Sequence, residues 1–177
     1  MTSVGVAVLV IVLLAACGTG TATRPGAGGP AAAPTPQVSL SAQMQGTAAL
    51  LRTALARVGR RVGPAVGPYR PSEPGSFADA PRAVLQADVG DANEGLIVIY
   101  EFADPATAAA RGQEFADHLE SGFGQTNYPL DAQFALGQVG GTLVFTWWTR
   151  EGSADPAAAE AAFDAVASVG LPIPVVK

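Results

Sequence analysis

The feature that most constrains the fold is a strand–turn–strand–helix pattern that occurs twice in the second half of the chain. In the first copy, residues 83–89 and 96–102 read as strands, and they flank a polar turn at 91–95. Asp104-Pro105 follows and begins a stretch that is expected to be helical to about residue 121. An Asp oxygen can accept an unpaired backbone N–H at a helix start, and Pro has no N–H to lose there.

The second copy uses the same parts in the same order. Residues 132–138 and 142–148 read as strands, Gly140-Gly141 turns the chain, and Asp155-Pro156 begins a helix that is expected to reach about residue 169. The same four residues, Ala-Asp-Pro-Ala, stand at both helix starts. This repetition fits either a duplication or the reuse of one motif.

An amphipathic helix of about 20 residues is expected before the first copy. Its apolar residues recur at spacings of three and four, as one face of a helix requires: Leu40, Met44, Ala48, Leu51, Leu55, Val58 and Val62. Ser39 or Ser41 is expected to cap its start, and Gly63-Pro64 to end it. Its polar side carries Arg52, Arg57, Arg60 and Arg61 and no acid, which suits either a solvated surface or contact with anionic lipid headgroups.

Together these elements predict an α+β domain over residues 39–177. An N-terminal helix is followed by two ββα units, which give a four-stranded, mainly antiparallel sheet with helices packed on it. The Pro- and Gly-rich residues 63–81 are expected to form an irregular connection.

The N-terminal residues 1–16 have no charged side chain and contain an apolar run that is too short to span a bilayer. The run ends in Leu14-Ala15-Ala16-Cys17, which resembles the lipobox of bacterial lipoproteins at every position. That resemblance implies a signal peptide over residues 1–16, cleavage before Cys17, and a diacylglyceryl group on its thiol. The alternative is an ordinary secretory signal with a chance cysteine. No Lys or Arg precedes the apolar run, which departs from the usual pattern.

Lipidation would make Cys17 a membrane anchor, since two acyl chains hold a protein stably on a bilayer. Residues 17–38 would then be the lipidated Cys and a flexible Gly, Ala, Pro and Thr tether of roughly 25 Å as a coil. The expected location is the outer leaflet of the cell membrane, or the outer membrane in a two-membrane cell.

Charge is unevenly distributed along the chain. Residues 18–82 carry a net charge of +5, and residues 83–177 carry −10. The acidic total and the expected export both argue against nucleic acid as a partner.

A candidate binding surface follows from the second strand of each hairpin, which is apolar on both faces. Because side chains alternate between faces, Trp147 and Trp148 point to opposite sides. One face is expected to lie under the two later helices. The other needs cover from the first helix or a second copy of the chain, or it forms a groove for an apolar ligand or a partner protein. Its residues are Ile97, Ile99, Val144 and Trp148.

No catalytic residue, metal site or cofactor is predicted. His118 is the only histidine, and with Glu114 four residues earlier it makes a helix-surface pair rather than a metal site. The turn acids Asp88, Asp91 and Glu94 are expected to be solvated. The sequence has no nucleophile motif and no phosphate-binding loop.

The expected function is therefore a non-catalytic binding or interaction module of the cell envelope. One alternative is an envelope enzyme whose carboxylates converge only in the fold, for example Glu101 and Asp131 with His118. Another is a regulatory or structural homo-oligomer. Ile99-Tyr100-Glu101-Phe102 and the strand 143–148 loosely resemble small uncharacterised lipoproteins of GC-rich bacteria, a similarity that brings no activity with it.

Overall fold

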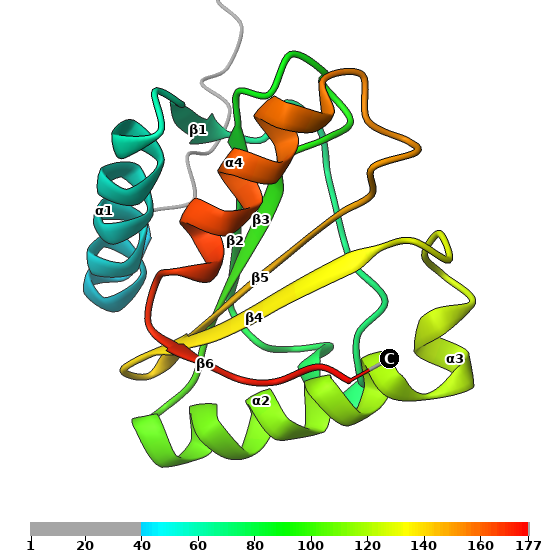
Figure 1. Ribbon diagram of the computed structural model, residues 1–177. Helices are drawn as coiled ribbons and strands as arrows, with labels where there is room; N and C mark the ends of the chain where they lie inside the picture. The colour runs from blue at the N-terminus through cyan, green and yellow to red at the C-terminus, as the bar shows by residue number, and fades with distance from the viewer. Residues whose placement is uncertain (1–39, 177) are drawn as a thin grey trace, which may run out of the picture. The chain divides into compact units, whose positions relative to one another are not determined.

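The two hairpins form the centre of one antiparallel sheet in the computed structural model, which describes residues 40–176 (Figure 1). Strand β2 (Arg82–Ala87) pairs with β3 (Leu96–Glu101), and β4 (Gln133–Val139) pairs with β5 (Thr142–Trp148). The hairpins join through β3 and β5, where Ile99 lies opposite Val144. The four central strands thus occupy the predicted segments.

Two short strands extend the sheet, so its order is β1-β2-β3-β5-β4-β6. Strand β1 (Val62–Pro64) pairs with β2, and β6 (Leu171–Pro172) pairs with β4, both antiparallel. The α+β class and the antiparallel sheet are confirmed, but the prediction of four strands is wrong, because residues 40–176 form six. Both additional strands contain Pro and have at most three residues, so neither shows an alternating pattern.

The two later helices begin where the Asp-Pro pairs predict. Helix α2 (Pro105–Glu120) starts after Asp104, whose side chain accepts a hydrogen bond from the N–H of Thr107. Helix α4 (Pro156–Ala167) starts after Asp155, which accepts from the N–H of Ala158. Short helical segments, η1 (Gly75–Phe77) and α3 (Gly122–Gln125), complete the chain between the longer elements.

The first helix, α1 (Ala42–Arg57), is capped by Ser41 but ends earlier than its apolar pattern predicts. Gly59 adopts a φ of 72°. Its N–H donates to the carbonyl oxygen of Ala56, and the N–H of Arg60 donates to the carbonyl oxygen of Leu55. These two bonds form a Schellman motif, which ends the helix because few residues other than glycine adopt this conformation. Val62 consequently belongs to β1.

Helices α1 and α4 cover one face of the sheet, and α2 covers the other (Figure 1). The prediction that the two later helices share a face is therefore wrong. The face under α1 and α4 is aliphatic and alanine-rich, including Met44, Leu51, Leu55, Ile97, Ile99, Val144, Ala162 and Val166. The α2 face holds most of the rings, including Phe77, Tyr100, Phe115, Tyr128, Phe145 and Trp147.

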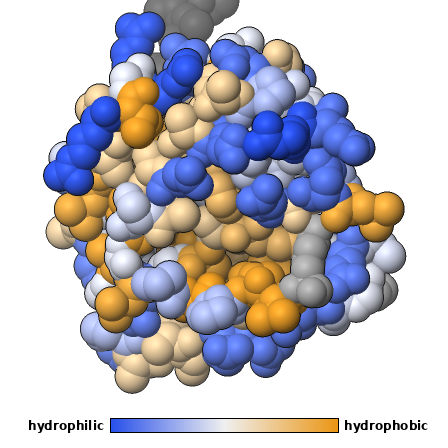
Figure 2. All heavy atoms as spheres, viewed as in Figure 1, coloured by the Kyte–Doolittle hydropathy of each residue, from blue (hydrophilic) through white to orange (hydrophobic). Residues whose placement is uncertain are grey.

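All of this core lies in one compact unit of the chain. On the side seen in Figure 2, apolar side chains reach the surface between α4 and α2, the region crossed by β4 and β6 in Figure 1. Within residues 40–176, no helix is both long and apolar enough to cross a bilayer.

Candidate functional site

The predicted binding surface is largely inside the protein. Ile97, Ile99 and Val144 are at most 2% exposed, because α1 and α4 cover this face of β3 and β5. The alternative in which the first helix covers the face is therefore the one that the structure shows. Trp148 lies at the far end of β5, is 6% exposed, and borders a cavity.

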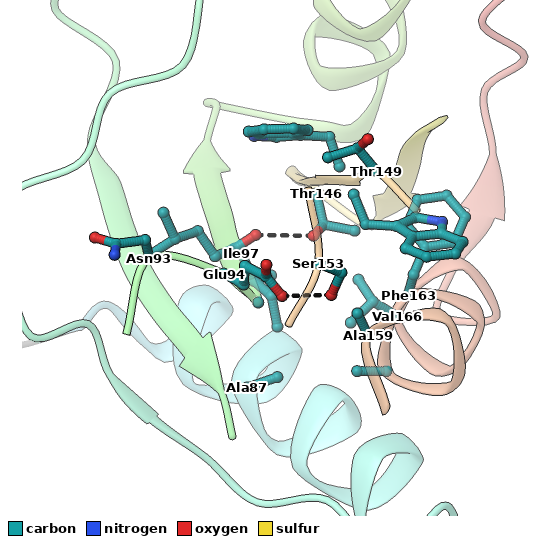
Figure 3. A pocket seen from close by; sticks show the side chains of 15 residues that line it. Ala87, Asn93, Glu94, Ile97, Thr146, Thr149, Ser153, Ala159, Phe163 and Val166 are labelled. Atoms are coloured by element: carbon teal, nitrogen blue, oxygen red, sulfur yellow. Dashed lines mark hydrogen bonds between the residues drawn. The ribbon is translucent and has the colours of Figure 1, made fainter. Parts of the chain in front are cut away.

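This cavity lies between the start of β3, the end of β5 and helix α4. Its volume is about 50 Å³. Its apolar walls come from these three elements and from the end of β2: Ala87, Leu96, Ile97, Trp148, Ala159, Ala162, Phe163 and Val166. Figure 3 shows Phe163, Val166 and Ala159 on one side and Ile97 on the other.

The cavity has a polar end, formed by the turn before β3 and the loop after β5. The hydroxyl of Ser153 donates to Glu94 Oε2 at 2.6 Å (Figure 3), and the N–H of Ala154 lies 3.3 Å from Glu94 Oε1. Asn93 is exposed, whereas Glu94 and Ser153 are half-buried, so this end is the one nearest to solvent. No ion pair among residues 40–176 includes Glu94. Its carboxylate therefore has hydrogen-bond donors but no counter-ion within the described part of the chain.

Trp148 forms part of the wall with one polar group unused. Its ring lies 6.2 Å from that of Phe163, and the guanidinium of Arg150 lies 5.4 Å from its centroid. The indole N–H is buried and has no acceptor within the described part of the chain. A buried unpaired donor costs about 1–3 kcal/mol, so a native site that keeps one calls for an explanation.

The size of this cavity limits what it can hold. A water molecule needs roughly 10–15 Å³ of such space, so the cavity holds a few waters or one short alkyl group. Its one acid, Glu94, accepts from the Ser153 hydroxyl and lies beside the N–H of Ala154, and no histidine is among the lining residues.

The residues of the enzyme alternative do not converge. Glu101 accepts from Ser41 Oγ at 2.8 Å and pairs with Thr142, at the start of β5. Asp131 accepts from Thr149, just after the end of the same strand. The length of β5, at about 3.4 Å per residue, separates the two acids by roughly 20 Å.

Asp131 and His118 also have partners that suit structural roles. The Thr149 hydroxyl and the N–H of Glu151 hold the pKa of Asp131 below its usual value, which keeps it ionised. His118 Nε2 lies 3.1 Å from Ser72 Oγ, on the α2 face. Glu114 instead contacts Arg111 and Ser76, so the predicted pair of His118 with Glu114 is not formed.

The three turn acids also point to different partners. Asp88 lies 3.6 Å from Arg61, Asp91 accepts from the N–H of Asn93, and Glu94 turns toward Ser153. In the described part of the chain, no group of three or more His, Cys, Asp or Glu side chains is placed to hold a metal ion.

One acid with a buried side chain, Glu73, serves the fold. Glu73, whose side chain is 4% exposed, accepts from Tyr100 at 2.5 Å and from Arg82 Nη1 at 3.0 and 3.1 Å. Arg70 adds an ion pair at 2.5 Å. These contacts fix the irregular segment 69–82 against the aromatic face of the sheet.

Comparisons with family models, with curated proteins and with solved structures give no match to this chain. Cys17 and the expected tether lie outside the described residues. Sequence reasoning identified Ile97 and Trp148 but missed the roles of Glu94, Ser153 and Phe163. Glu94 and Ser153 are 59 residues apart, so no local pattern could have joined them.

Proposed function

We propose that this chain is an exported lipoprotein, anchored through Cys17, whose domain binds a small ligand without chemical conversion. The lipobox resemblance of Leu14-Ala15-Ala16-Cys17 supports the anchor. The cavity beside Trp148 carries the binding role, since it combines apolar walls with one carboxylate that has no counter-ion in residues 40–176.

The lining defines the class of ligand. The apolar walls suit a short alkyl group, and the carboxylate of Glu94 suits a cation or a hydrogen-bond donor. A small primary amine with a short alkyl chain has both parts.

The anchor is tested by native mass spectrometry of the full protein, purified from its own membranes in mild detergent. A mass that starts at Cys17 and includes acyl chains is expected, with a discrete adduct if the ligand is retained. An unlipidated mass that keeps residues 1–16, or a lipid-free mature chain, would contradict the anchor.

The binding site is tested by NMR of the two indole N–H groups while short alkylamines are added. The Trp148 N–H signal is expected to shift, whereas that of Trp147, which donates to Tyr69 at 2.8 Å, should move little. Short alkylcarboxylates of the same size should have no effect, because Glu94 repels them.

A matched pair of variants locates the cation site. Glu94→Gln should abolish the preference for amines over carboxylates. Glu151→Gln removes the same charge from the loop between β5 and α4, outside the cavity, and should keep the preference. Equal effects of the two variants, or no amine-dependent shift at all, would refute this site.

A further inference from the structure

The face of α1 that points away from the sheet carries positive charge without acids. Arg52 and Arg57 are exposed on the helix, and Arg61 follows it with a side chain that is 92% exposed. No Asp or Glu occurs between residues 39 and 72. Arg61 has one acidic neighbour, Asp88 at 3.6 Å, and exposed pairs of this kind contribute little free energy.

Apolar side chains accompany these arginines. Leu50 is 50% exposed and lies seven residues before Arg57, which places both on one edge of the exposed face, whereas Arg52 lies on the other edge. Val58, directly after α1, is 41% exposed. Over α1, at the left of Figure 2, strongly hydrophilic and apolar side chains lie next to one another. Cations beside exposed apolar groups are the composition of helices that lie on a membrane interface.

The acidic residues of the domain lie outside α1, although two of them are on the neighbouring helix α4. Helix α4, which packs beside α1, carries Glu160 and Asp164, and Glu160 is paired with Arg150 at 2.7 Å. Residues 83–177 carry a net charge of −10. An anionic surface would attract the arginines of α1, and it would repel most of the domain that follows, including Asp164 on the neighbouring α4.

We propose that the exposed face of α1, with Arg52, Arg57, Arg61 and Leu50, docks on an anionic lipid bilayer. Charge complementarity carries this proposal, and the chain that precedes the helix strengthens it. The predicted tether ends at residue 38 and would hold α1 roughly 25 Å from a lipid on Cys17 if the tether is a coil, or about 65 Å if it is polyproline II. The proposal does not depend on the cavity or on the lipidation itself.

The test measures binding of residues 38–177, which keep both core clusters, to sedimented vesicles. One set of vesicles is phosphatidylcholine, and the other is phosphatidylcholine mixed with phosphatidylglycerol. Binding to the anionic set alone is expected, and it should weaken in high salt because salt screens exposed charges. Each arginine near an anionic surface is worth about fivefold in binding.

Two double variants with equal net charge locate the surface. Arg52→Gln with Arg57→Gln should lower binding roughly twentyfold. Arg111→Gln with Arg150→Gln changes the net charge equally but lies outside α1 and should change binding less than fivefold. Arg52, Arg57 and Arg111 lie in helices, where Arg and Gln have similar propensities, and Arg150 is exposed in the loop after β5, so both proteins should fold. No preference of the wild type for anionic vesicles, or equal losses in both variants, would overturn the proposal.

Discussion

At the scale of single residues, the three tyrosines of the chain share one environment. Tyr100 donates to Glu73, Tyr128 accepts from the N–H of Ser72 at 3.1 Å, and Tyr69 accepts from Trp147. Burial raises the pKa of all three hydroxyls above the ordinary tyrosine value, and the hydrogen bond to Glu73 raises that of Tyr100 further. Each hydroxyl is therefore neutral in the folded protein.

These raised pKa values predict unfolding in alkali. Below about pH 10, the ordinary tyrosine pKa, the hydroxyls are neutral in both states and the stability is unaffected. Above that pH the unfolded chain loses protons that the folded protein keeps, so stability falls as the pH rises. Tyrosinate absorbance and circular dichroism should then change together.

The control is the same titration in strong denaturant, where tyrosine absorbance should change near pH 10. If the native protein showed the same absorbance change with an unaltered circular dichroism spectrum, the tyrosines would be ionising in the folded state. That result would contradict their burial.

At the scale of elements, the link between α4 and β6 depends on Gly170. Its φ is 84°, and a Cβ there would lie 2.3 Å from the carbonyl oxygen of Gln138 in β4. Gly170→Ala therefore adds a backbone clash to the cost of a positive φ, which alone is about 1–2 kcal/mol. We expect a loss of more than about 2 kcal/mol in the free energy of unfolding, measured by urea denaturation.

Gly59→Ala is the matched control for this prediction. Gly59 has a φ of 72°, but a Cβ there would have no atom within 4 Å. Its replacement should cost only about 1–2 kcal/mol. Equal losses for the two variants would mean that β6 and β4 do not approach as closely as the structure shows.

The elements also show what sequence patterns can and cannot predict. The Asp-Pro helix starts and the strand β5 were predictable, because caps and long apolar runs are local signals. The end of α1 was not, since Gly59 stops the helix although Val58 and Val62 continue its apolar stripe. The face of the sheet on which each helix packs could not be predicted either, because β3 and β5 are apolar on both faces.

The candidate site was only half predictable for a related reason. Trp148 stands in a conspicuous strand, but Glu94 reaches the cavity through a turn that ends at Gly95, with a φ of 70°. A Cβ at Gly95 would lie 2.5 Å from the carbonyl oxygen of Ala87. The sequence does not show such a close approach between two segments. The turn acids, Glu94 included, were therefore expected to be solvated.

At the scale of the whole molecule, both faces of the sheet are covered by helices of the same chain. This removes the uncovered apolar face on which the homo-oligomer hypothesis rested. The strands at the two edges, β1 and β6, have three and two residues, too short to offer much pairing to a second copy.

We therefore expect residues 38–177 to be a monomer in solution. Light scattering over a range of protein concentrations should give the mass of one chain throughout. A mass that rises to twice that value would instead indicate an interface outside the sheet faces, and the apolar surface between α4 and α2 would be the first place to look.

The opposite orientation of the two neighbouring tryptophans has a practical consequence. Trp147 lies among the aromatic rings under α2, and Trp148 lies against Phe163 of α4. The chain has no other tryptophan. With either one replaced by Phe, fluorescence would come from one layer of the protein only. Two such variants would reveal whether the layers separate together or one after the other during denaturation.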